Sequence, residues 1–63
     1  MKKYLIVGDT VDENGNVYKD DIIKACYCHT YRFVQECLEE TKIDPYYNSK
    51  YTNIHISVDY EEV

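Results

Sequence analysis

The sequence has no tryptophan, one proline, one phenylalanine and two glycines, and it contains no long apolar run. The longest run near the N-terminus, Leu5-Ile6-Val7, is far shorter than the ~18 residues of a membrane span, and it is too short for the apolar core of a signal peptide. We therefore expect a soluble protein that does not enter a membrane and remains in the cytoplasm.

Basic residues are also few, since 7 Lys and Arg stand against 12 Asp and Glu and give a formal charge of -5. Proteins that bind a phosphate backbone need clustered Lys and Arg, so we expect no direct nucleic-acid ligand. A chain of 63 residues buries only roughly 60% of its unfolded surface, which leaves little volume for a deep substrate cavity. We expect one small domain over residues 1–63 that is not an enzyme and holds no cofactor.

Cysteine is odd in number, and Cys26, Cys28 and Cys37 all fall within a stretch that we expect to be helical. No disulfide framework can be drawn from three cysteines, and reduced thiols are expected. On one helix Cys26 and Cys37 would lie about 16 Å apart, too far to share a zinc ion, so no metal site is expected. Cys28 would lie on the polar side, where it could form an intermolecular disulfide in air, whereas its neighbour His29 would not face it.

Tyrosine is the abundant aromatic residue, with eight copies in the chain. Tyrosine suits half-buried surfaces and interfaces, because its ring packs while its hydroxyl stays hydrated. Leu, Ile, Val and Phe make up about 24% of the chain, only slightly above the ~20% below which a charged chain is expected to stay disordered. The thin core predicts self-association, most simply as a homodimer, through the side of the last strand or a sheet edge near Tyr46, Tyr47 and Tyr51.

The first half of the chain predicts a hairpin followed by a helix. Tyr4–Val7 is a short strand, Asn14-Gly15 is a strong two-residue turn signal, and Asn16–Lys19 forms the second strand. Asp20 or Asp21 then caps a helix. Over residues 22–41, placed at 100° steps, the apolar side chains fall within about half of the circle, as expected for a helix that packs on a core.

Pro45 ends this helix, and Tyr46–Lys50 is expected to be a loop. Residues 53–60 alternate between apolar and polar side chains and predict the last strand. The expected fold is α+β with the order ββαβ, in which one amphipathic helix packs on one face of a three-stranded antiparallel sheet. The spatial strand order is 2-1-3, and the helix connects strands two and three by a right-handed crossover.

The whole net charge lies in residues 33–63, where seven acidic side chains face only Lys42 and Lys50. In the expected topology Asp20, Asp21 and the acidic C-terminal residues lie near Lys2 and Lys3. The hairpin tip approaches the C-terminal end of the helix, where acidic residues oppose the helix dipole. These acids either keep a small protein soluble or form a docking pole. The residues of this pole are Asp12, Glu13, Glu36, Glu39, Glu40, Asp44, Tyr46 and Tyr47.

Residues 10–21 partly resemble the twelve-residue calcium loop of EF-hand and dockerin proteins, with oxygen ligands at positions 1, 3 and 5, Gly at 6 and a carboxylate at 12. The departures are Thr10 at position 1, Asp21 in place of a bidentate glutamate at position 12, and a strand in place of the first helix. An ordinary hairpin is favoured, and calcium binding is the alternative.

Three classes of function remain open. The first is a non-enzymatic protein-binding module, an inhibitor that places carboxylates and tyrosines on a basic or nucleic-acid-binding surface of a partner, as DNA mimics do. In composition the chain is similar to the small acidic antagonists that phages and mobile elements encode against host enzymes or defence systems, and the similarity covers no motif. The alternatives are a homodimeric structural or regulatory subunit and, third, a calcium- or small-ligand-binding domain.

Overall fold

The structure, a computed structural model, describes residues 1–63 as three strands and two helices. The elements are β1 (Lys2–Val11), β2 (Val17–Cys28), α1 (Tyr31–Ile43), α2 (Pro45–Lys50) and β3 (Thr52–Glu62). β1 lies in the centre and pairs antiparallel with both neighbours, which gives the strand order β2-β1-β3. The expected α+β fold and sheet order are confirmed.

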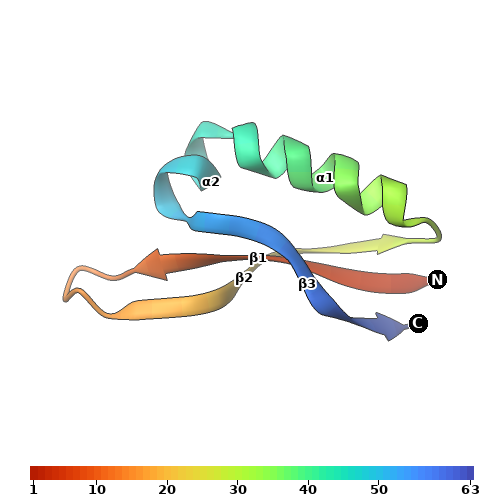
Figure 1. Ribbon diagram of the computed structural model, residues 1–63, viewed down its shortest axis with the longest axis horizontal. Helices are drawn as coiled ribbons and strands as arrows, with labels where there is room; N and C mark the ends of the chain where they lie inside the picture. The colour runs from red at the N-terminus through yellow and green to blue at the C-terminus, as the bar shows by residue number, and fades with distance from the viewer.

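The molecule has two layers, because both helices lie on the same face of the sheet (Figure 1). Its Cα extents are 39 × 21 × 13 Å, and the view down the shortest axis shows the helix layer stacked on the sheet layer (Figure 1). The opposite face of the sheet carries no covering element (Figure 1). Neither helix has the length and apolar character needed to cross a membrane.

The hairpin between β1 and β2 forms at the expected Asn-Gly turn. Gly15 has φ +84, a left-handed conformation that glycine adopts without a side-chain clash. The backbone N–H of Asp12 donates to the Asn16 carbonyl at 3.0 Å, and that of Gly15 donates to the Asp12 carbonyl at 3.1 Å. The hairpin prediction is confirmed, but the turn has Glu13 and Asn14 at its centre and Gly15 at its end, and the strands are much longer than expected.

The expected helix start at Asp20 or Asp21 is wrong, because β2 continues to Cys28 and α1 begins only at Tyr31. The segment after Asp21 is rich in β-branched and aromatic residues, which favour a strand. It pairs with the first residues of β1, from Ile6↔Lys24 to Lys2↔Cys28. The apolar residues of this segment fit both a helical and a strand pattern. Pairing with the start of β1, far earlier in the chain, makes the segment a strand.

The residue expected to cap the helix instead lies at an irregularity of the sheet. Asp20 has φ +54, and the β1–β2 register shifts on both sides of the Val7↔Ile22 and Gly8↔Asp21 pairs. Aspartate tolerates this left-handed conformation better than most residues, because its short polar side chain can bond locally. The same residue type serves at helix caps and at strand irregularities, so the sequence pattern does not separate the two.

α1 packs on the sheet through one face, from which Val34 and Thr41 are buried and Cys37 and Leu38 are half-buried. The Thr41 hydroxyl donates to the Cys37 carbonyl one turn earlier at 2.7 Å. A bond of this kind satisfies a hydroxyl that lies on the buried side of a helix. Thr30 precedes α1 as its N-cap and is exposed.

Residues 46–50 are helical, so the loop expected there is wrong as well. Pro45 begins α2, and the Asp44 carboxylate accepts a hydrogen bond from the Tyr46 N–H at 2.9 Å. Proline suits the first position of a helix, because the N–H that it lacks would have no partner there. Pro45 therefore ends α1 and starts α2.

The core lies between the sheet and α1. Its buried residues are Tyr4, Ile6, Cys26, Cys28 and Val34, and partly buried Ile23, Cys37, Leu38, Ile54 and Ile56 pack against them. Only 9 of 63 residues are buried. The core is therefore as thin as the composition predicts.

Candidate protein-interaction surface

The outward face of α1 carries exposed carboxylates. Glu36, Glu39 and Glu40, here called the acidic helix face, line a shallow surface hollow together with Arg32 and Gln35. The only ion pair among them joins Arg32 Nε to Glu36 Oε1 at 4.0 Å, between side chains that are 89% and 66% exposed. Such an exposed pair contributes little to stability, so these carboxylates remain open to solvent.

The hairpin tip, by contrast, uses its carboxylate for folding. Asp12 accepts hydrogen bonds from the N–H groups of Asn14 and Asn16 at 2.9 Å each, from the Asn16 amide at 3.1 Å and from the Tyr18 hydroxyl at 3.1 Å. These bonds, above all the one from the Asn16 backbone, hold the pKa of Asp12 below its ordinary value of 3.8. Glu13 is exposed and makes no such bonds. The tip projects beyond both helices at the left of Figure 1.

The remaining residues of the expected pole lie at α2. Asp44 is the cap of this helix, and the Tyr46 and Tyr47 rings contact each other edge to face at 5.1 Å. Lys24 lies over the Tyr47 ring at 5.2 Å, and Lys50 lies over the Tyr46 ring at 5.8 Å. Tyr46 is nevertheless 62% exposed. Asp12 and Asp44 thus serve local structure, whereas the acidic helix face, Glu13 and Tyr46 remain accessible.

Of the acidic residues that were expected near Lys2 and Lys3, only those at the C-terminus lie there. Glu61 is 3.9 Å from Lys3 Nζ, and Glu62 is opposite Lys2 in the ladder. Asp21, however, pairs with Gly8 and lies far along the sheet from Lys2. The placement of Asp20 and Asp21 beside these lysines was wrong, because β2 is longer than expected.

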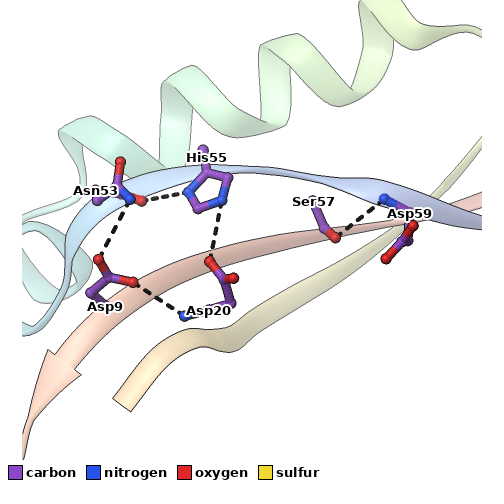
Figure 2. Close-up of polar contacts among 6 residues, drawn as sticks. All are labelled: Asp9, Asp20, Asn53, His55, Ser57 and Asp59. Atoms are coloured by element: carbon purple, nitrogen blue, oxygen red, sulfur yellow. Dashed lines mark hydrogen bonds and ion pairs between the residues drawn. The ribbon is translucent and has the colours of Figure 1, made fainter. Parts of the chain in front are cut away.

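A polar cluster that the sequence analysis did not predict crosses all three strands (Figure 2). Asp9 of β1 accepts from the Asp20 N–H of β2 at 3.1 Å and from the Asn53 amide of β3 at 3.5 Å. His55 places Nε2 3.4 Å from Asp20 Oδ1 and Nδ1 2.6 Å from the Asn53 carbonyl. Ile6 and Ile56 pair toward the core, so the next pair, Val7 and His55, points to the uncovered sheet face.

This cluster has an unusual backbone but no catalytic arrangement. Asp20 and Asn53 are the two non-glycine residues with positive φ, +54 and +52. The Asp20 carboxylate and the His55 imidazole form a pair, yet the Ser57 hydroxyl accepts from the Asp59 N–H at 3.4 Å and does not approach the ring (Figure 2). No group of three or more His, Cys, Asp or Glu side chains is arranged to hold a metal ion.

The cysteines lie closer together than predicted. Cys26 and Cys28 face the core from β2, each 6% exposed, and Cys37 packs against the same core cluster from α1. The expected 16 Å separation and the exposed position of Cys28 are both wrong, because these two cysteines lie on a strand. Burial, with a smaller effect of the neighbouring Cys37 thiol, raises the pKa of Cys26 to about 11.

The sequence predicts the acidic helix face but not the polar cluster. Exposed glutamates on an amphipathic helix follow from its periodicity. The polar cluster depends on strand register, and its only local signals are Asp20-Asp21 and Asn53, residue types that tolerate positive φ.

Comparison with known proteins identifies no relative, because no family model, no curated protein and no solved structure matches this chain.

Proposed function

We propose that this protein is a non-enzymatic, cytoplasmic protein-binding module that inhibits or antagonises a partner by docking the acidic helix face on its basic surface. The observation that carries the proposal is the row of three exposed glutamates on the outward side of α1, with only one weak internal ion pair. Carboxylates placed in this way accelerate association with a basic partner and select against acidic ones.

Accessible apolar and aromatic surface near the end of α1 supports the proposal. Ile43 is 77% exposed at the last turn of α1, and Tyr46 follows on α2. An interface needs apolar or aromatic anchors inside a charged rim, because charge steers the encounter while buried area holds the complex. Glu13, on the projecting hairpin, adds a further carboxylate to this proposed surface.

The partner class that we propose is a basic or nucleic-acid-binding protein, and the origin that we propose is a phage or mobile element. Spaced carboxylates can occupy sites that a protein uses for phosphates, in the manner of a DNA mimic. Duplex DNA should then compete with this protein for the partner. Failure of DNA to compete would restrict the proposal to a basic surface that does not bind nucleic acid.

The test compares the wild-type protein with Glu36→Lys/Glu39→Lys/Glu40→Lys. Binding partners are captured from the source cells, purified, and their association and dissociation rates measured at low and high salt. The triple variant should associate roughly tenfold or more slowly at low salt, with a smaller change in dissociation, since steering acts on association.

A matched control reverses three acids elsewhere, Asp59, Glu61 and Glu62. It has the same net charge as the helix variant, so slower association of the helix variant alone identifies the surface. Unchanged association of the helix variant at low salt contradicts the proposal.

A second candidate function is that of a homodimeric structural or regulatory subunit. The specific observation is that both edge strands expose apolar side chains, including Ile22 and Tyr27 of β2 at 60% and 54% and Val58 of β3 at 93%. Unpaired edges invite pairing with another strand. Sedimentation should detect a dimer whose stability is insensitive to salt, whereas a monomer at every concentration would exclude this candidate.

A further inference from the structure

Three cysteine side chains meet where β2 passes beneath α1. Cys26 and Cys28 face the helix from the strand and are buried, and Cys37 packs against the same cluster from α1 with partial exposure. All three thiols are free. The cluster therefore contains two buried thiols and one that a small molecule can reach.

The path of the chain brings Cys26 and Cys37 to the same level of the molecule. The chain reverses at His29 and Thr30, so α1 runs back over the strand that it has just left (Figure 1). Cys26 lies roughly 7 Å back from the end of β2, and Cys37 lies roughly 9 Å along α1, from the rise per residue of each element. The two thiols are close enough to interact.

We propose that Cys26 and Cys37 are an oxidisable pair, which a low-molecular-weight disulfide such as oxidised glutathione converts into an intramolecular disulfide between β2 and α1. The thiolate of Cys37, the more exposed of the two, attacks one sulfur of oxidised glutathione and releases one glutathione thiolate. The Cys26 thiolate then attacks the Cys37 sulfur of this mixed disulfide and releases the second glutathione. The protein loses two protons and two electrons, and the electrons remain on the two glutathione molecules.

The second step should be slow at neutral pH. The thiolate is the attacking species, and burial raises the pKa of Cys26 to about 11, so only a small fraction of this thiol is ionised at pH 7. The rate of closure should therefore increase roughly tenfold per pH unit between about pH 7 and 9.

The bond would close a loop of about a dozen residues and tie the helix that carries the acidic helix face to the edge of the sheet. From the entropy removed from the unfolded chain, the melting temperature should increase by roughly 20 °C. This inference does not depend on any partner, so it can fail or succeed separately from the proposed function.

The experiment treats the full-length protein with oxidised glutathione at several pH values and quenches the reaction with acid. Intact mass should show a transient glutathione adduct and then a product lighter by two hydrogen atoms. Cleavage after Tyr27 and after Arg32 separates all three cysteines, so the linked peptides identify the bond directly. The Cys28→Ser variant should still close, and Cys37→Ser should not.

Mapping of the wild-type product does not depend on whether any variant folds. A bond that maps to Cys28, a stable adduct on Cys37 that never closes, or disulfide-linked dimers in place of the internal bond would each overturn the proposal. So would a closed product whose melting temperature does not increase.

Discussion

At the scale of single residues, Gly8 of β1 lies in a tightly packed part of the molecule. A Cβ atom at this position would lie 3.1 Å from the Cβ of Tyr51, 3.2 Å from Cδ1 of Ile23 and 3.3 Å from the Thr52 carbonyl oxygen. Tyr51 is 8% exposed and its hydroxyl donates to the Asp21 carboxylate at 3.2 Å, so it is held from both ends. Burial raises the pKa of this hydroxyl. Glycine is therefore needed here for space.

Gly8→Ala should destabilise the protein by about 1 kcal/mol, because the added methyl group overpacks a filled site. Chemical denaturation measures this cost. Ile23→Val removes the Cδ1 atom that the new methyl group would meet, so its cost should be smaller in the Gly8→Ala background than in the wild type. Additive costs would show that the contact with Ile23 is not the source of the strain.

Asp12 should make the stability of the protein decrease at low pH. Its pKa is lowered in the folded protein by the hydrogen bonds from Asn16, Asn14 and Tyr18. The stabilisation is therefore fully present above its ordinary value of 3.8 and is lost as the pH falls through the lower, folded value. As the pH falls below 3.8, the melting temperature of the wild-type protein should decrease more steeply than that of Asp12→Asn. Glu13→Gln, which changes an exposed neighbour, should keep the wild-type slope; equal slopes in all three proteins would contradict this account.

At the scale of elements, the sequence predicted most elements whose signals are local, with α2 as the exception, and missed those that depend on distant pairing. Local patterns predicted the hairpin at Asn14-Gly15, the strand over residues 53–60 and the buried face of α1 from Val34 onward. The structure contains all three. Residues 22–28 satisfy both a helical and a strand pattern, and only their pairing with β1 separates the two. The polar cluster of Asp9, Asp20 and His55 was missed for the same reason.

Carbon chemical shifts should distinguish these two assignments directly. Residues 22–28 should show the Cα and Cβ shifts of extended backbone, and residues 31–43 those of helix, with the change between them at His29 and Thr30. Asp20 and Asn53 should depart from the strand values of their neighbours, because both have positive φ. Helical shifts that continue from residue 22 to residue 41 would show that β2 ends before Ile22 instead of at Cys28.

At the scale of the whole molecule, acidic residues lie in two different electrostatic settings. Glu61 and Glu62 face Lys3 and Lys2 across the sheet, whereas Glu39 and Glu40 lie toward the C-terminal end of α1, where the helix dipole favours cations, and Glu36 lies near the middle of this helix. A surface arranged only for stability would place basic residues on that helix. The placement is consistent with a surface retained for binding, which is the basis of the proposed function.

The stability of the two triple charge reversals should therefore change in opposite directions. Glu36→Lys/Glu39→Lys/Glu40→Lys should raise the melting temperature by a few degrees at low salt, because the excess of negative charge falls and a cation at position 40, in the last turn of α1, interacts favourably with the helix dipole. Reversal of Asp59, Glu61 and Glu62 makes the same change in net charge but places new lysines beside Lys2 and Lys3, so it should lower the melting temperature. Thermal unfolding of both variants at low and high salt measures the difference, which added salt should reduce. If both variants were stabilised equally, net charge alone would explain the effect and the position of the glutamates on α1 would carry no energetic cost.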